Sequence, residues 1–247
     1  MKHRKPFSME QTLPQVKVGF SVTNHYSEKI RPNGRELLKE YLVSVQNSCK
    51  YPFEVFIIDN QSENMLDESK LPSNFHYHYV KDQSIGGLTH AWNLGIREAV
   101  KHKCDVIFNT NEDLIINESI NDFVSAIWNH KYKNVSIYGP VSNDEGVSTH
   151  HQRRDEAGTK LIETTNDPWD GRQGYALNGF FYGFTRTMVK KFWIDENLFS
   201  PEQWCSWNGQ EIEIHDRCWP LGMRSFIAEQ CFVEHMKLKD WQHFRSC

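Results

Sequence analysis

The sequence predicts a single α/β domain with a central, mostly parallel β-sheet flanked by helices. Strand patterns alternate with amphipathic helix patterns over the first half of the chain, which is typical of βαβ units. Residues 52–58 form an almost continuous apolar run, as in strands that are buried on both faces of a parallel sheet. The length of 247 residues is enough for one such domain with a full core.

The first half supplies the strands and helices in turn. Apolar or alternating runs predict strands at 16–22, 52–58, 75–80 and 106–108. A helix is predicted after Asn33, which would cap it together with Glu36. A second helix is predicted after the glycine-bearing turn at 84–87, because an i, i+3, i+4 apolar stripe follows it.

The second half is less regular. Asn117 would cap a helix whose core face begins at Ile120. Residues 141–175 are polar and show neither a helical nor a strand period, and a loop of this length inside a compact domain is usually functional or mobile. The remaining elements are predicted as strands at 135–138, 180–184 and 224–228, a short helix from Thr185 and a helix near 210–219. Residues 1–15 are expected to be a flexible arm, and residues 16–247 one domain.

Composition and charge exclude several classes of protein. The net charge is −4, whereas nucleic-acid binders usually carry a basic face. No run approaches the about 20 apolar residues that span a bilayer, and the basic N-terminus has no apolar segment after it that would make a secretory signal. The six cysteines lack CxxC spacing, which fits free thiols in a reducing compartment. A cytoplasmic protein without a transmembrane segment is therefore expected.

Acidic residues follow the predicted strands. The 106–108 strand runs into a polar patch that ends in Asp113, and Asp59 ends the 52–58 strand. Open α/β sheets bind ligands just beyond the carboxyl ends of their parallel strands. A carboxylate there can hold a divalent cation, and the cation can hold nucleotide phosphates. Glu211 and Glu213 supply a further acidic segment.

The order of these motifs resembles a GT-A (Rossmann-like) glycosyltransferase fold, most similar to family 2 and its inverting relatives. The resemblance covers roughly residues 16–235, although about five short motifs carry it. The matching segments are Ile57–Ser62, Gly86–Gly87 with Ala91–Ile96, Asn111–Asp113 at the DxD position, Gln210–Glu213 with Arg217 at the ED-x-D…R position, and Val233–His235.

The resemblance implies transfer of a sugar from a nucleotide-diphosphate sugar to a hydroxyl acceptor, with inversion and with Mn²⁺ or Mg²⁺. The acceptor would be a glycan, a lipid-linked glycan or a protein. Residues 16–116 would bind the nucleotide sugar, and residues 117–247 would supply the acceptor and catalytic half. The implied roles are the catalytic base for Glu211, the metal for Asp113 and His235, the donor for Thr23, Asn24, Asp59, Asn60, Gly86, Asn93 and Asn111, and the acceptor for Asn178, Gly179, Glu213 and Trp207.

The sequence departs from the family pattern at two positions. Asn111 replaces the first Asp of DxD, and a neutral amide is a weaker ligand for a hard cation than a carboxylate. Gln210 replaces the first acid of the ED pair, which leaves Glu211 aligned with the base.

Structural roles remain open for several of these residues. Asp59 could cap a turn, Asp113 could cap the next helix, and Glu213 with Arg217 could form an exposed i, i+4 ion pair. His235 could be structural, and Trp207 could belong to the core. A retaining transferase and an inactive sugar-nucleotide-binding module are the alternative functions. Glu211→Gln would affect a retaining enzyme only mildly, and an assay of donor hydrolysis would distinguish an enzyme from an inactive module.

Overall fold

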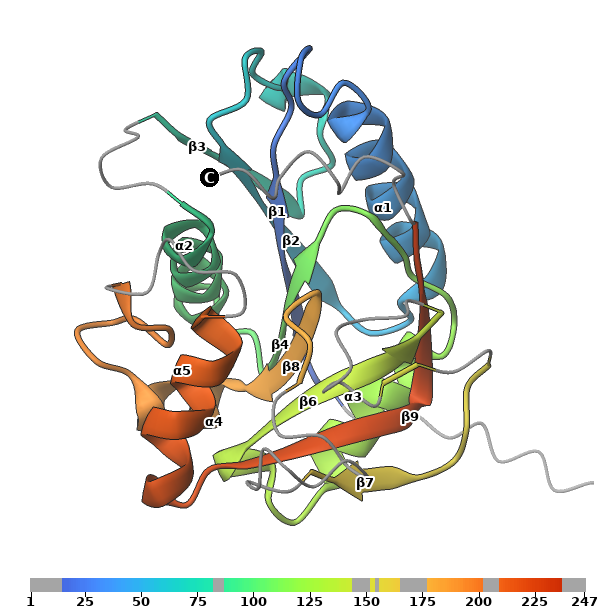
Figure 1. Ribbon diagram of the computed structural model, residues 1–247. Coiled ribbons are helices and arrows are strands. Elements are labelled where there is room, and N and C mark those ends of the chain that lie inside the picture. The colour runs from blue at the N-terminus through green and yellow to red at the C-terminus, as the bar shows by residue number, and fades with distance from the viewer. Residues whose placement is uncertain are drawn as a thin grey trace, which may run out of the picture.

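The computed structural model describes residues 15–81, 87–143, 152–153, 156–164, 177–201 and 209–236. Helices cover both faces of a central sheet (Figure 1). The strands are β1 (Val18–Asn24), β2 (Phe53–Asn60), β3 (Phe75–Val80), β4 (Val106–Asn111), β5 (Leu114–Ile115), β6 (Ser136–Ser142), β7 (Leu161–Glu163), β8 (Phe181–Thr185) and β9 (Arg224–His235). The helices are α1 (Gly34–Ser48), α2 (Leu88–Lys101), α3 (Ile120–Asn129), α4 (Arg186–Phe192) and α5 (Gly209–Cys218), with 3-10 turns η1 (Glu68–Lys70), η2 (Lys133–Val135) and η4 (Trp219–Leu221).

The first half of the sheet is parallel, as predicted. Its strands lie in the order β3-β2-β1-β4, and each neighbouring pair is parallel. Helices α1 and α2 lie on opposite sides of β1 and β2 (Figure 1). The carboxyl ends of β1, β2 and β4 consequently meet at one edge of the sheet.

The second half of the sheet is mixed. Strand β8 inserts between β4 and β6 and is antiparallel to both. Strands β6 and β9 are parallel, while β5 and β7 pair antiparallel with β9. The α/β fold class is confirmed, but the sheet is mostly parallel only up to β4. A strand's own residue pattern shows that it is a strand and carries no information on the direction of its partner.

The core lies on both faces of the sheet. Successive strand residues point to opposite faces, so β2 contributes Val55 and Ile57 to the core that α1 and α3 cover. The same strand contributes Phe56 and Ile58 to the core that α2, α4 and α5 cover. Burial of each such side chain stabilises the fold by about 1.5–3 kcal/mol, so the apolar 52–58 run is explained by packing on two sides.

Several element boundaries differ from the predictions, and the differences at β6, β7 and β9 concern the region around the candidate site. Strand β9 continues to His235, so this histidine ends the strand and does not follow it. Strand β6 reaches Ser142, and β7 lies inside the 141–175 region that was predicted to have no strand. Strand β7 consists of three residues, which is too short for a period-2 pattern to be recognised.

The two predicted helix caps also differ. Asn33 precedes α1, but its side chain makes no capping hydrogen bond, and its backbone oxygen accepts from Leu37 N at 3.0 Å. Helix α3 begins after Ser119, and the Asn117 side chain accepts hydrogen bonds from the backbone and the hydroxyl of Ser119. Thr185 caps α4 through its hydroxyl, which accepts from Met188 N.

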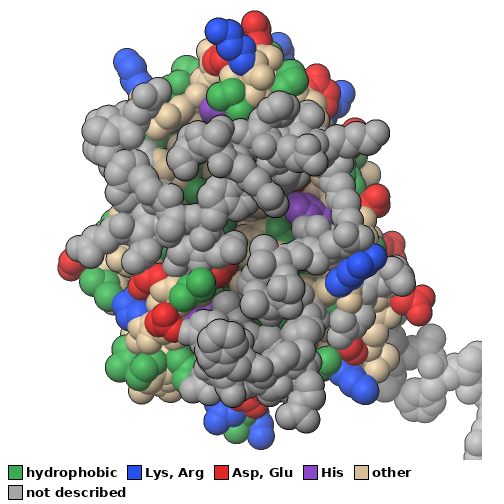
Figure 2. Space-filling view, in the orientation of Figure 1, with side chains coloured by type: hydrophobic (Ala, Val, Ile, Leu, Met, Phe, Trp, Pro, Cys, Tyr) green, Lys and Arg blue, Asp and Glu red, His purple; other side chains and the backbone are tan. Residues whose placement is uncertain are grey.

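Three further features of the described residues concern membrane-spanning helices, thiols and surface charge (Figure 2). Within the described ranges, no helix has both the length and the apolar character needed to cross a membrane. Cys49, Cys104, Cys218 and Cys231 are buried free thiols. On the face shown in Figure 2, the described Lys and Arg side chains lie scattered among Asp and Glu.

Candidate active site

Five of the predicted donor residues lie at one edge of the parallel sheet. Strand register places Asn24 beside Asp59 and Thr23 beside Asn111. Asn60 is the last residue of β2. The parallel topology therefore brings residues of β1, β2 and β4 together, although they are far apart in sequence.

Asp59 is fully buried and is held by three donors. Its Oδ2 accepts from the Tyr77 hydroxyl at 2.7 Å and from Arg35 Nη2 at 3.0 Å. Its Oδ1 accepts from Ser62 N at 3.0 Å, so the predicted turn-capping role is present. An ionised carboxylate offers about four lone-pair sites, which leaves about one for a ligand.

Asn24 organises the start of α1. Its amide donates to Gly34 O at 3.0 Å, and its Oδ1 accepts from Arg35 Nη1 at 2.8 Å. A Cβ on Gly34 would lie 2.3 Å from the backbone oxygen of His25, so only glycine fits beside this turn. Asn24 thus positions the arginine that contacts Asp59.

Two other predicted donor contacts have polar atoms available. Thr23 Oγ1 and Asn60 Oδ1 are buried and have no hydrogen-bond partner within the described part of the chain. A buried polar atom without a partner costs about 1–3 kcal/mol. A ligand hydroxyl or amide at this edge would remove that cost.

Arg31, Glu112, Asp113 and His235 form a buried charged cluster. Arg31 Nε lies 2.9 Å from Glu112 Oε1, and Arg31 Nη2 lies 3.3 Å from Asp113 Oδ2. His235 Nε2 lies 3.4 Å from Asp113 Oδ1 on the other side of the carboxylate. Strand β5, which follows Asp113, pairs with the end of β9, and this pairing brings the histidine to the acid.

The two carboxyls of this cluster differ in proton affinity. Burial raises the pKa of Glu112 to about 7, against the opposing charge of Arg31. Burial alone would also raise the pKa of Asp113, but His235 and Arg31 hold it below its ordinary value. Asp113 is consequently the ionised member of the pair at neutral pH.

The residues present fit a divalent cation. A carboxylate oxygen of Asp113 and an imidazole nitrogen of His235 lie 3.4 Å apart and face one another. Mg²⁺-type ions are typically held by one or two carboxylates together with substrate phosphates, and imidazole also suits transition metals. A dedicated cage of protein ligands is therefore not required.

The segment 177–180 lies between this cluster and Glu211. The Phe180 ring stacks on His235 at 5.5 Å between centroids, and Phe180 O accepts from Asn111 N at 3.0 Å. The adjacent Gly179 contacts the Glu211 carboxylate: a Cβ on it would lie 2.3 Å from Glu211 Oε1. One short stretch of backbone thus touches both halves of the site.

Glu211 is buried near the start of α5. Burial raises its pKa, although its own backbone N–H and that of Gly179 donate hydrogen bonds that oppose the shift. Its Oε2 has no hydrogen-bond partner among the residues that the structure describes. A buried carboxylate with a raised pKa and an available oxygen is suited to accept a proton.

Two other predicted contact residues form bonds within the protein. Glu213 forms an i, i+4 ion pair with Arg217 that is partly buried, whereas an exposed pair was the expected alternative, and it accepts from Ser200 N at 3.1 Å. Asn93 uses its side chain to bond the backbone of residues 198–199. Both side chains anchor the 198–200 segment.

Asn178 is held through its backbone. Its N–H donates to Gln152 Oε1 at 2.7 Å, and Gln152 in turn donates to Pro140 O at 2.8 Å. Gly86 and Trp207, predicted for the donor and the acceptor, lie outside the described residues. Of the predicted N-terminal arm, residues 1–14 also lie outside the described residues.

The sequence interpretation missed Arg31, Arg35, Tyr77, Gln152 and Phe180. Arg31 and Arg35 lie four residues apart around the start of α1, in a stretch that was taken only as a polar loop and a cap. Tyr77 could have been found, because parallel pairing of β3 with β2 in register places it close to Asp59. No local signal identified Gln152, which lies in the irregular 141–175 region.

Comparison with known proteins identifies the family. The family model described as glycosyl transferase family 2 matches residues 32–193, which is well over half of the chain. No match was found among curated protein sequences.

Solved structures have a similar fold. A crystal structure of GalNAc-T7 with UDP, GalNAc and Mn²⁺ has a TM-score of 0.63 at 15% identity, covering 94% of this chain and 46% of that one. S. aureus TarS 1–349 has a TM-score of 0.57 at 17% identity, covering 88% and 60%. Its complex with UDP has a TM-score of 0.59, also at 17% identity, covering 89% and 60%. The chain thus spans about half of these longer structures, and its family model, fold and motif order agree: it belongs to glycosyl transferase family 2.

Proposed function

We propose that this chain transfers a sugar from a nucleoside diphosphate sugar to a hydroxyl acceptor, with inversion at the anomeric carbon. The observation that carries the proposal is the state of Glu211, a buried carboxylate with a raised pKa and one oxygen without a partner in the described part of the chain. Membership of family 2 supports the reaction type.

The donor nucleoside would bind at the edge formed by β1, β2 and β4. Thr23 Oγ1 and Asn60 Oδ1 have no hydrogen-bond partner among the described residues, and Asp59 supplies about one remaining acceptor site. Arg35 and Tyr77 fix the Asp59 carboxylate before the ligand arrives, which lowers the entropy cost of binding. Because two of the similar structures are complexes with UDP, we propose a UDP-sugar as the first donor to test.

Asp113 and His235, with Asn111 nearby on β4, would hold Mn²⁺ or Mg²⁺ beside the diphosphate. When bound, such a cation acts as a Lewis acid that stabilises the negative charge of the leaving group. Arg31 adds a fixed positive charge next to Asp113. The Phe180 ring stacked on His235 keeps the imidazole oriented.

Glu211 would act as the general base. The acceptor oxygen attacks the anomeric carbon, its proton moves to Glu211 Oε2, and the bond from that carbon to the diphosphate breaks. A carboxylate is a weak base for an alcohol, so proton removal must accompany the attack. Gly179 leaves room for the carboxylate and donates a backbone hydrogen bond to it.

Residues 16–116 would then hold the donor, while residues 117–247 would supply the base and the acceptor pocket, including Asn178 and Gly179. We propose a glycan, a lipid-linked glycan or a protein hydroxyl as the acceptor. The cytosol is the proposed compartment, on the argument that widely spaced free thiols suit a reducing environment.

A thermal-shift panel tests the donor class. UDP, GDP, dTDP and CMP would each be added with and without Mn²⁺, and UDP with Mn²⁺ should give the largest rise in melting temperature. At 100 times Kd a ligand stabilises the fold by about 2.7 kcal/mol, which corresponds to several degrees for a chain of this size. Thr23→Val removes the unpartnered hydroxyl at constant shape and should reduce the shift.

The other outcomes are equally informative. If UDP raised the melting temperature equally with and without Mn²⁺, the result would support a glycosyltransferase that does not use the cation. No shift with any nucleotide would contradict the proposed function.

A further inference from the structure

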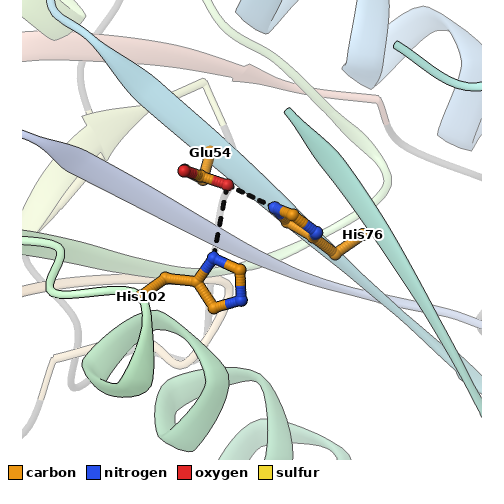
Figure 3. Close-up of side chains that lie close together, drawn as sticks. All are labelled: Glu54, His76 and His102. Atoms are coloured by element: carbon orange, nitrogen blue, oxygen red, sulfur yellow. Dashed lines mark hydrogen bonds and ion pairs between the residues drawn. The ribbon is translucent and has the colours of Figure 1, made fainter. Parts of the chain in front are cut away.

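A second group of metal-ligating side chains lies away from the candidate active site. Glu54 is near the start of β2, His76 is near the start of the adjacent β3, and His102 directly follows α2 (Figure 3). Glu54 precedes Asp59 by five residues on the same strand, a separation of about 16 Å at 3.3 Å per residue. The group therefore occupies the opposite edge of the parallel sheet.

The three side chains converge on one point. His76 Nε2 hydrogen-bonds to Glu54 Oε2, and His102 Nδ1 lies 3.5 Å from the same oxygen. One potential ligand atom from each residue lies within 4.8 Å of the other two. Zinc ligands lie about 2.0–2.2 Å from the ion, so in a tetrahedral site they are about 3.3 Å from one another. Small side-chain movements would bring the three atoms to that spacing.

The surroundings hold the ligands in place. Phe56 stacks on His76 and meets the edge of His102, with both centroid distances at 5.1 Å. Lys17 Nζ contacts the other carboxylate oxygen, Glu54 Oε1, at 2.6 Å and also donates to His102 O at 3.1 Å. Partners outside the ligand shell usually orient metal ligands in this way.

The site is also accessible from solvent. The side chains of His76 and His102 are 27% and 31% exposed, so an ion can enter from solvent and retain a water molecule.

We propose that Glu54, His76 and His102 form a binding site for a divalent transition metal of the zinc type, completed by water. Two imidazole nitrogens favour Zn²⁺ over Mg²⁺ or Mn²⁺, which prefer oxygen ligands. The bound ion links β2, β3 and the end of α2. Structural zinc sites normally have four protein ligands, so a site with three holds an exchangeable ion.

Equilibrium dialysis of the full chain against Zn²⁺, without nucleotide, tests the site. The wild type should bind one equivalent that the His76→Ala/His102→Ala variant does not bind. His90→Ala, which removes another partly exposed histidine on α2, should retain it. Asp113→Asn should also retain it, which separates this site from the proposed donor cation.

Single substitutions and a spectroscopic probe complete the test. Loss of a partner outside the ligand shell costs about 10–100-fold in affinity, so His102→Ala alone should cost at least about tenfold. At the same Zn²⁺ concentration the melting temperature should rise more in the wild type than in His102→Ala. Co²⁺ should show the d–d absorption of a low-symmetry nitrogen and oxygen site. A wild type without this equivalent, or a double variant that keeps it, would overturn the proposal.

Discussion

Asp59 and Glu211 are both buried carboxylates, yet the protein surrounds them differently. Asp59 lies in the regular parallel half and accepts from Tyr77, Arg35 and Ser62. Glu211 lies in the mixed half, where burial raises its pKa and one of its oxygens has no described partner. A carboxylate held by three donors is fixed in place, whereas one with an oxygen that has no described partner, in a poorly solvated place, is a better proton acceptor. The difference supports the proposal that Asp59 helps to position the donor and that Glu211 accepts the proton.

The largest expected effect is on turnover in Glu211→Gln. Release of nucleoside diphosphate from the sugar nucleotide, measured by coupled assay, should fall by about 10²–10⁴-fold, which is the usual contribution of a general base. Nucleotide affinity should stay unchanged, because the amide keeps the shape of the side chain. Glu213→Gln on the same helix is the matched control and should lose much less activity. Equal losses in both variants would contradict the distinction between them.

Gly179→Ala should reduce turnover by about 10²-fold, since a misplacement of about 1 Å can cost this much. The new Cβ would meet Glu211 Oε1 at 2.3 Å and displace the carboxylate. Gly158→Ala creates a comparable contact, 2.7 Å from the carboxylate of Glu229 at the surface, and should leave turnover unchanged. Steady-state kinetics of both variants decides whether the Glu211 position matters.

Opposite effects on stability are expected at the two carboxylates. Asp59→Asn should destabilise the fold by about 2 kcal/mol, because it removes charged hydrogen bonds from Arg35 and Tyr77. Glu211→Gln should stabilise it. A raised folded-state pKa gives stability that is present below the ordinary value of 4.5 and lost as the pH rises through the folded pKa.

Urea denaturation across pH measures this difference. The advantage of Glu211→Gln over the wild type should grow from acidic to neutral pH. If both variants destabilised the protein equally, the two carboxylates would not differ as described.

The smallest effect is expected for Tyr77→Phe. Loss of the 2.7 Å bond to Asp59 should weaken nucleotide binding by about fivefold, or about 1 kcal/mol, while leaving the saturated rate unchanged. Tyr51→Phe, which removes a hydroxyl contact to Ser125 elsewhere, is the control for the calorimetric titration. A lower saturated rate with unchanged nucleotide affinity would contradict a role for Tyr77 in positioning the donor.

The parallel half of the sheet could be predicted from sequence more fully than the mixed half. Apolar periodicity located the parallel strands, and parallel topology then placed Thr23, Asp59 and Asn111 at one edge. The pattern could not give the direction of β8 or β9, because direction depends on distant partners. Nor could it show that Gly179 lies against Glu211, a contact between residues 32 positions apart that depends on how β8 and α5 pack.

The catalytic claim is tested most directly by the pH dependence of donor turnover in the wild type beside Glu211→Gln. Since Glu211 must be deprotonated to act, the wild-type rate should be full above its raised pKa and fall as the pH drops through it, on a limb above the ordinary 4.5. The variant should be slow at every pH and lack this limb. A variant that turns over at the wild-type rate with the same limb would contradict the assignment of Glu211 as the base.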